Sequence, residues 1–319
     1  MASDDNGVAI IINSKAGANL AGGDRQLEVR LREALQLLGA VRDVKWVDGK
    51  SLARAVTAAV ERDDVDILVM AGGDGSVSYA GNECARTRKT LLPLPFGTYN
   101  LVCRSLALPV DPNVAISQIP AMIPTRIDMG TANGHGFLHH VSAGLHPRFI
   151  EARNALPYRS RWGKMRSAFG AMRQVLKTIA RWPVRLDIDG HTKTHWIAGL
   201  AITVNKVAET PGMTAVVDDP AGGALAVYLA DVRDSWGALL LLARYITGGR
   251  RPGPFLDVKS ASNVIVGKRR SSLTVSIDGE TRRLELPLTI KLRRRALKVL
   301  APERMTTSTT EINQPRSAA

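Results

Sequence analysis

A short apolar run that ends in three glycines and one aspartate constrains the fold of this chain more than any other segment. Residues 68–76 read Leu-Val-Met-Ala-Gly-Gly-Asp-Gly-Ser, which predicts a buried strand, a tight turn and the start of a helix. Glycines let backbone N–H groups approach a polyphosphate closely, and the amino end of a helix adds a favourable dipole. Asp74 in this turn could meet the Mg²⁺ that accompanies such a phosphate. An ordinary strand-to-helix turn has the same composition, so both interpretations stay open at this point.

The first 125 residues alternate between expected strands and expected helices. The strands are predicted at 8–13, 44–47, 65–71 and 91–95, and the helices at 24–38, 51–61, 76–88 and 98–106. Strands separated by helices indicate βαβ units and a parallel sheet. Such a sheet binds its ligands at the carboxyl ends of the strands, which is where the glycine turn lies.

Beyond residue 125 the pattern changes to period-two alternation, which is typical of half-buried antiparallel strands. These strands are predicted at 125–130, 137–143, 184–189, 196–204, 224–230, 262–267, 273–277 and 286–293. Together they indicate a β-sandwich. The expected fold is an α/β nucleotide-binding domain at 1–125 followed by an all-β domain at 126–304. The tail at 305–319 has no apolar period and is expected to be disordered.

A basic helix is predicted inside the second domain, at 161–182, where apolar residues recur at spacings of three and four. The segment 148–181 holds nine Lys and Arg residues and one acid, Glu151. Residues 126–319 hold 30 Lys and Arg against 15 Asp and Glu, a net charge of +15, whereas residues 1–125 hold 13 against 14. A basic amphipathic helix in such a domain fits an anionic membrane surface. The alternative is that its apolar stripe packs on the sandwich and its basic face is merely solvated.

Composition disfavours several classes of protein. No apolar run approaches the roughly 18 residues that span a bilayer, and the first residues lack the basic start and apolar core of a secretory signal. Two cysteines, Cys84 and Cys103, are too few for a disulfide framework and favour a reducing compartment. The basic runs 268–270 and 293–295 have few aromatic residues between them, so we expect no nucleic acid partner. The expected location is cytoplasmic and peripheral at the inner face of the cell membrane, with the oligomeric state open and a homodimer among the options.

Three further segments accompany the glycine turn at 72–76. Residues 13–17 follow the first predicted strand, residues 95–100 follow a later one, and Asp-Gly-Glu stands at 278–280. This set resembles the diacylglycerol kinase catalytic-domain superfamily, which includes sphingosine kinases and bacterial lipid kinases, with the NAD kinases as distant relatives. The family pattern has Asn-Pro-x-Ser-Gly, Gly-Gly-Asp-Gly-Thr, Pro-x-Gly-Thr-x-Asn-Asp and Asp-Gly-Glu segments, and the chain meets them in the same order. The resemblance covers residues 8–302.

The resemblance implies a kinase that transfers the γ-phosphoryl group of ATP to a lipid hydroxyl such as that of diacylglycerol. The residues expected to bind ATP are Asn13, Gly72, Gly73, Gly75, Ser76, Thr98 and Asn100. Asp74 would organise Mg²⁺, and Asp128 would join it through water. Asp278 would be the general base, with Glu280 nearby. In the sphingosine kinase branch the base is the aspartate at the place of Asp74, so the roles of the two aspartates stay open.

The chain departs from the family pattern at several positions. Ser14 replaces the usual proline and Ser76 the usual threonine, and both changes are mild. Leu101 stands where the third loop normally has an aspartate, which removes one carboxylate from the magnesium network. Residues 222–226 replace an Asp-Gly-x-Leu-Asp segment that surrounds a structural Mg²⁺ in bacterial members, so we expect that site to be absent. Two alternatives therefore remain: a kinase for a soluble hydroxyl substrate such as NAD, and a nucleotide- or lipid-binding regulator without turnover.

Overall fold

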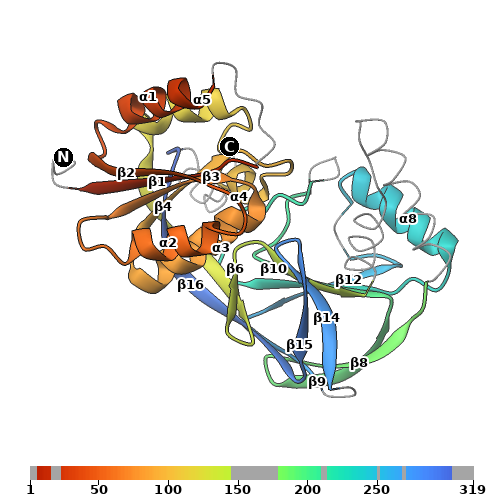
Figure 1. Ribbon diagram of the computed structural model, residues 1–319. Coiled ribbons are helices and arrows are strands. Elements are labelled where there is room, and N and C mark those ends of the chain that lie inside the picture. The colour runs from red at the N-terminus through yellow and green to blue at the C-terminus, as the bar shows by residue number, and fades with distance from the viewer. Residues whose placement is uncertain are drawn as a thin grey trace, which may run out of the picture. The chain divides into compact units, whose positions relative to one another are not determined.

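Figure 1 shows the computed structural model of the protein, which describes residues 6–15, 23–144, 179–209, 214–249, 252–267 and 271–303. The chain divides into two compact units. The first comprises Met1–Asp128, Asp219–Ala221 and Arg294–Ala319, and the second comprises Met129–Asp218 and Gly222–Arg293. The chain thus returns to the first unit at two later points. The expected division at residue 125 treats each domain as one continuous segment and does not include these returns.

Strands and helices alternate in the first unit, as expected. Its elements are β1 (Gly7–Asn13), α1 (Gly23–Leu35), β2 (Ala40–Val47), α2 (Leu52–Val60), β3 (Ile67–Gly72), α3 (Asp74–Thr87), β4 (Thr90–Pro95), α4 (Leu101–Ser105), α5 (Pro112–Ser117), the 3-10 helix η1 (Ile119–Ala121), the start of β5 (Ile123–Ala132) and the end of β16 (Leu288–Ala301). The parallel strands lie in the order β2-β1-β3-β4, and the end of β16 adds to β4 in parallel. Helices α1 and α5 cover one face of this sheet and α2 and α3 the other (Figure 1), which is why β1 and β3 are buried almost throughout.

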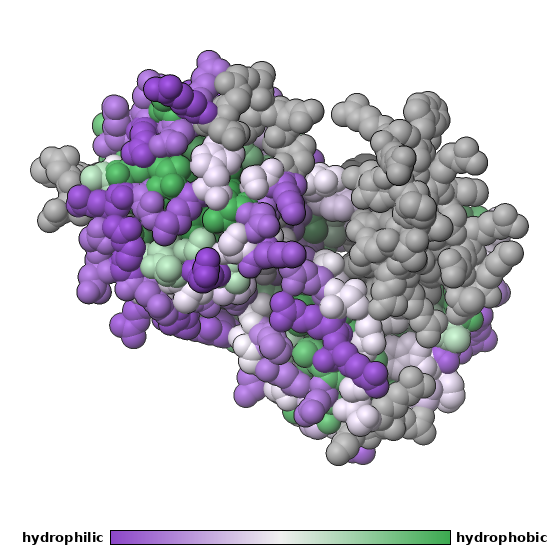
Figure 2. Space-filling view, viewed as in Figure 1, coloured by the Kyte–Doolittle hydropathy of each residue, from purple (hydrophilic) through white to green (hydrophobic). Residues whose placement is uncertain are grey.

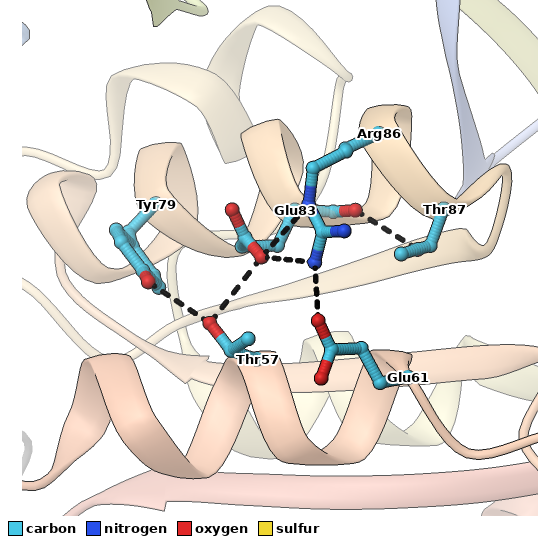
Figure 3. Close-up of polar contacts among 6 residues, drawn as sticks. All are labelled: Thr57, Glu61, Tyr79, Glu83, Arg86 and Thr87. Atoms are coloured by element: carbon cyan, nitrogen blue, oxygen red, sulfur yellow. Dashed lines mark hydrogen bonds and ion pairs between the residues drawn. The ribbon is translucent and has the colours of Figure 1, made fainter.

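A polar network joins α2 to α3 on the surface of the first unit (Figure 3). The Thr57 hydroxyl lies 3.1 Å from the Tyr79 hydroxyl and donates to Glu83 Oε2 at 3.3 Å. Arg86 Nη2 donates to the same Glu83 oxygen at 2.8 Å and to Glu61 Oε1 at 3.1 Å. Glu83 therefore accepts hydrogen bonds from both helices, and it does so with a side chain that is only 17% exposed.

Replacing Glu83 with alanine is expected to lower the free energy of unfolding by about 1 kcal/mol, because Thr57 and Arg86 lose a partly buried acceptor. Glu61→Ala is the matched control: its side chain is 56% exposed and makes one ion pair with the same arginine, so we expect a change below about 0.5 kcal/mol. Chemical denaturation of both variants measures the difference. Equal effects would show that the partly buried position of Glu83 adds no stability.

The described part of the second unit is built mainly of antiparallel strands. Its elements are the end of β5, β6 (His135–Phe137), β7 (His140–Gly144), β8 (Trp182–Ile188), β9 (His191–Ile197), β10 (Gly199–Val204), β11 (Leu225–Ala230), α8 (Ser235–Ile246), β12 (Leu256–Ala261), β13 (Asn263–Val266), β14 (Ser272–Ile277), β15 (Glu280–Glu285) and the start of β16. One sheet has the order β12-β11-β10-β7-β14-β15, and in the other β13 joins the start of β16 to β8 and β9.

A single hydrophobic core fills the space between these two sheets. It takes Ile202, Val227 and Val275 from the first sheet and Leu186 and Val264 from the second, all of them fully buried. Side chains of two facing sheets that share one core define a sandwich. The expected fold class, an α/β domain followed by a β-rich domain, is confirmed. Among the helices of the described ranges, none is long and apolar enough to cross a membrane.

Several expected element boundaries are wrong. The strand predicted at 137–143 is two strands, β6 and β7, and the strand predicted at 196–204 is likewise divided between β9 and β10. The end of the helix predicted at 161–182 is also wrong, since Trp182 begins β8 and pairs with Ile197. Pro183 explains this, because a residue that precedes proline disfavours the helical conformation. Residues 179–181, also predicted as helix, are not helical. Residues 161–178 of that helix, the basic run 268–270 and the tail at 305–319 lie outside the described residues.

Candidate functional site

The carboxyl ends of three neighbouring parallel strands bring the first three predicted loops to one edge of the sheet. β1 ends at Asn13, β3 at Gly72 and β4 at Pro95, and the register pairs Gly72 with Pro95. In the order β2-β1-β3-β4, the direction in which successive strands are added reverses between β1 and β3. Open α/β sheets bind ligands at such a switch point. Topology therefore indicates the same edge as the sequence motifs.

The glycine turn leads directly into α3. Gly73 is the N-cap residue of this helix and, having no side chain, it makes no capping hydrogen bond. The N–H groups of the first turn are thus left without an N-cap side chain, which suits a helix end that receives an anion. Gly72 has a different role, because a Cβ there would lie 2.7 Å from the Cβ of Ser76. Gly72 thus permits close packing against Ser76, whereas Gly73 leaves the backbone of the turn accessible.

Asn13 connects the end of β1 to the first turn of α3. Its Nδ2 donates to Ser76 Oγ at 3.1 Å, and its Oδ1 accepts from the backbone N–H of Lys15 at 3.1 Å. These bonds hold the amide and the hydroxyl together at the switch point between β1 and β3. The structure thus brings into contact two of the residues that the sequence predicts to bind ATP.

The loop after β4 is shaped from within by Asn100. This residue is buried and has φ 52° and ψ 45°, a left-handed conformation that asparagine tolerates better than most residues. Its Oδ1 accepts from the N–H of Gly97 at 2.8 Å, and its Nδ2 donates to the carbonyls of Pro95 and Gly97 at 3.2 and 3.0 Å. Thr98, by contrast, is exposed. Of the two residues predicted to bind ATP here, Asn100 holds the loop and Thr98 is accessible to a ligand.

A methyl group at Gly97 is expected to push this loop away from the glycine turn. A Cβ there would lie 2.5 Å from the Cα of Gly73 and 2.8 Å from Oδ1 of Asn100. We expect Gly97→Ala to lower the free energy of unfolding by about 2 kcal/mol and to weaken the ATP binding that the sequence predicts. Gly49→Ala is the control, because a Cβ at Gly49 would meet nothing within 4 Å. Denaturation and equilibrium ATP binding test both variants, and unchanged binding by Gly97→Ala would contradict the close approach of the loops.

Asp74 joins the glycine turn to the short helix α4. Its Oδ1 accepts from the backbone N–H of Leu101 at 2.6 Å. Leu101, which stands where the family pattern has another aspartate, therefore contacts Asp74 through its backbone N–H. This hydrogen bond does not depend on the side chain at position 101. Cys103 lies in the same helix, where burial raises the pKa of its thiol and the charge of Asp74 raises it further. The thiol stays protonated and is no candidate nucleophile.

Asp128 lies where three separate segments of the first unit meet. Its Oδ1 accepts from the backbone N–H of Arg295 at 2.7 Å, and its own N–H donates to the carbonyl of Pro220 at 2.9 Å. These two bonds tie the segments near residues 220 and 295 to the first unit. The part of Asp128 in a magnesium network stays a prediction. Within the described ranges, no group of three or more His, Cys, Asp or Glu side chains is placed to hold a metal ion.

Asp278, the predicted general base, lies in a hairpin turn of the second unit. Asp278 and Gly279 join β14 to β15 with φ of 45° and 90°, the positive values that a two-residue Asp-Gly turn requires. The buried carboxylate accepts backbone N–H bonds from Leu138 at 2.7 Å, His139 at 2.9 Å and His140 at 2.8 Å. Both of its oxygens therefore hold the turn between β6 and β7. Asp278 therefore has a structural role in this turn. Its role as general base stays a prediction.

Glu280, the other predicted carboxylate of this segment, is in a different environment. Its side chain is 57% exposed, and Oε2 pairs with Arg282 at 3.0 Å. Sequence reasoning missed the groups that hold the other three carboxylates, because they are backbone N–H groups of Leu101, Arg295 and residues 138–140. Backbone groups carry no residue-type signal. The Asp-Gly dipeptide was the one available sign that Asp278 occupies a hairpin turn.

Comparison with known proteins agrees with the first three motifs, which lie within the matched residues. Residues 7–132 match the family model of the diacylglycerol kinase catalytic domain. The chain is 32% identical over 144 residues to a Pseudomonas aeruginosa protein named "Probable lipid kinase YegS-like", covering 44% of this chain and 45% of that protein. It is 37% identical over 81 residues to a diacylglycerol kinase of Staphylococcus saprophyticus, covering 25% of this chain and 27% of that one. The matches thus span less than half the length of these curated relatives.

The fold is also found in solved structures. A crystal structure of a diacylglycerol kinase from Bacillus anthracis superposes with a TM-score of 0.64 and covers 94% of this chain and 98% of that one. Sequence identity is 18%, so this likeness concerns the fold alone. The resemblance of the chain to the diacylglycerol kinase catalytic-domain superfamily is confirmed by these comparisons.

Proposed function

We propose that this protein, whose residues 7–132 match the diacylglycerol kinase catalytic domain, is an ATP-dependent lipid kinase that phosphorylates a lipid hydroxyl such as that of diacylglycerol. The observation that carries the proposal is the convergence of Asn13, Gly73 and the loop held by Asn100 at the carboxyl edge of the parallel sheet. Phosphoryl transfer needs little covalent chemistry from the protein, and mostly requires positioning and stabilisation of charge. A fixed set of loops around an uncapped helix end suits that requirement.

The first unit would bind the phosphates. The first-turn N–H groups of α3 and the helix dipole favour an anion there, and Asn13 and Ser76 fix the neighbouring polar groups. A bound Mg²⁺ would neutralise charge on the transferred group. Oxygen ligands suit that ion, and Asp74 and Asp128 are the carboxylates that we assign to it. Because no cluster of three such residues occurs in the described part of the chain, the phosphates themselves would supply most of the ligands.

The proton of the lipid hydroxyl would pass to a carboxylate, for which Asp278 is our first choice and Asp74 the second. The three backbone N–H bonds fix the orientation of the Asp278 carboxylate, as a positioned base needs. Glu280 would act only as a neighbouring charge. We place the reaction at the inner face of the cell membrane, where a basic second half would be attracted by anionic lipids.

The direct test uses the purified chain with radiolabelled ATP, Mg²⁺ and a lipid extract dispersed in detergent. Label should move into a lipid with a free hydroxyl, and diacylglycerol is the first substrate to try alone. NAD and small polyols serve as soluble acceptors in parallel reactions. Transfer to a soluble acceptor and to no lipid would replace the lipid kinase by a kinase for a soluble substrate, and transfer to none would reject both.

A regulator that binds nucleotide without turnover is the second candidate. It is favoured by the structural use of the Asp278 carboxylate and by the leucine at position 101. Equilibrium ATP binding measured beside the transfer assay distinguishes the candidates. Tight binding with undetectable transfer would support the regulator, whereas binding together with transfer supports the kinase.

A further inference from the structure

Helix α8 of the second unit (Figure 1) carries more exposed large hydrophobic side chains than any other described element. Trp236 is 66% exposed, Leu239 44%, Leu240 40% and Ile246 40%. In the first unit, such side chains are single residues of α1, α5 and the connecting segments, and hydrophilic residues cover much of its described surface (Figure 2). Single exposed hydrophobic residues are ordinary, whereas a group of them on one element marks an interaction surface.

The exposed residues of α8 lie on one continuous face. At about 100° per residue, the exposed positions occupy an arc of about 140°. These positions are Ser235, Trp236, Leu239, Leu240, Ala243, Ile246 and the C-cap residue Thr247. None of them is charged. The face is therefore apolar across its width, with one hydroxyl-bearing residue at each end.

The opposite side of α8 fastens it to its own unit. Gly237 is buried, and a Cβ there would lie 3.3 Å from the ring of Phe255. The Asp234 carboxylate caps the helix by accepting from the Gly237 N–H at 2.8 Å. Arg244 secures the other end, where Nε donates to the carbonyl of Gly249 and Nη2 to that of Pro252, both at 3.1 Å. Both polar groups are thus engaged on the side of α8 away from the exposed face.

The charges beside α8 identify what this face meets. Arg233 is exposed just before the helix, and Arg250 and Arg251 follow it in the sequence. The carboxylate of Asp234 is occupied as the cap. An apolar face with a tryptophan at one end and an exposed arginine, Arg233, just beyond that end suits the boundary between acyl chains and anionic head groups. An uncharged apolar face also suits a protein partner, so the choice of lipid rests on the adjacent arginine and on the proposed function.

We infer that α8 docks the protein on an anionic lipid bilayer, with Trp236, Leu239, Leu240 and Ile246 entering the head-group region and Arg233 remaining among the phosphates. The inference rests on the proposed function for its choice of a lipid surface. The helix would lie in the plane of the membrane and would not cross it. Binding then combines burial of apolar surface with attraction to anionic lipid, so salt should weaken it without abolishing it.

The test is co-sedimentation of the full chain with phosphatidylglycerol vesicles and, separately, with phosphatidylcholine vesicles. Wild type should bind the anionic vesicles more tightly. Trp236→Ser should reduce that binding by about tenfold or more, because the largest exposed side chain is lost. Trp196→Ser is the matched control: Trp196 lies on β9 of the same unit and is 55% exposed, and its replacement should leave vesicle binding unchanged.

Three outcomes of the vesicle assay would overturn the inference: wild-type binding by Trp236→Ser, an equal loss in Trp196→Ser, or failure of wild type to bind either vesicle. Sedimentation velocity without lipid would reveal a second copy on α8 as a dimer that Trp236→Ser dissociates, and that result would also overturn it. Transfer to lipid dispersed in detergent is measured on the same samples. If the Trp236→Ser variant keeps transfer and loses vesicle binding, both proposals stand, whereas vesicle binding without transfer by wild type rejects the kinase alone.

Discussion

Replacing Asp74 with asparagine is expected to lower phosphoryl transfer on the order of 10²-fold or more while leaving the fold intact. The amide oxygen of asparagine can still accept from the N–H of Leu101, so the connection between the glycine turn and α4 is kept. The negative charge that would organise the metal is lost. Asp74→Ala removes the acceptor as well, so we expect a similar loss of transfer together with about 1 kcal/mol of stability.

Transfer rate, equilibrium ATP binding and denaturation, measured on both Asp74 variants, separate these effects. Asp64→Asn is the control, because this carboxylate is exposed and pairs with Arg62 two residues away, so removal of its charge should change transfer and ATP binding little. If Asp74→Asn transfers phosphate at the wild-type rate and Asp74→Ala does not, the hydrogen bond to Leu101 matters and the charge does not. That result would remove Asp74 from the metal site and from the list of candidate bases.

Local sequence signals predicted the first unit well. The apolar runs that became β1, β3 and β4 are fully buried strands, as their composition requires. Asn13 and the glycines directly follow these apolar runs in the sequence. The loops could therefore be placed at one edge of the parallel sheet before any contact was known. The sequence could not show that Asp128 is bonded to the backbone of Arg295, because that contact joins residues 167 positions apart through a group common to all residues.

The second unit was less predictable, for two physical reasons. β15 lies at the end of its sheet and carries Arg282, Arg283 and Glu285 as exposed residues, so it lacks the apolar alternation by which strands are recognised. Charges on an edge strand discourage pairing with other chains. Asp278 was ambiguous in another way, since an Asp-Gly pair serves equally as a hairpin turn and as a catalytic segment. Its hydrogen bonds from the backbone N–H groups of residues 138–140, far away in the sequence, show that the Asp278 side chain stabilises the turn between β6 and β7.

Asp278→Asn is expected to lower the free energy of unfolding by about 3 kcal/mol, because hydrogen bonds to a charged acceptor are the stronger kind. The carboxylate offers two oxygens to the three backbone N–H groups, whereas the amide offers one and directs its NH₂ group at a donor. The turn between β6 and β7 should loosen as a result. Chemical denaturation of the variant and of wild type measures the loss.

Asp189→Asn is the matched control for this substitution. Asp189 and Gly190 form the equivalent turn between β8 and β9, with φ of 48° and 87°, and the Asp189 carboxylate accepts from the N–H groups of Ser262 and Asn263. Because Asp189 is exposed, we expect a loss of about 1 kcal/mol and unchanged transfer. Stability of Asp278→Asn equal to wild type would contradict the structural role of Asp278.

The transfer kinetics of Asp278→Asn test whether Asp278 is also the general base. A general base supplies about 10²- to 10⁴-fold, and this contribution disappears even from molecules that remain folded. A residue that only positions the turn should instead lower transfer in proportion to the folded fraction, with an unchanged pH profile for the molecules that stay folded. Transfer measured against pH at a temperature where the variant is folded therefore distinguishes a base from a support. Near-wild-type transfer there would leave Asp74 as the remaining candidate base.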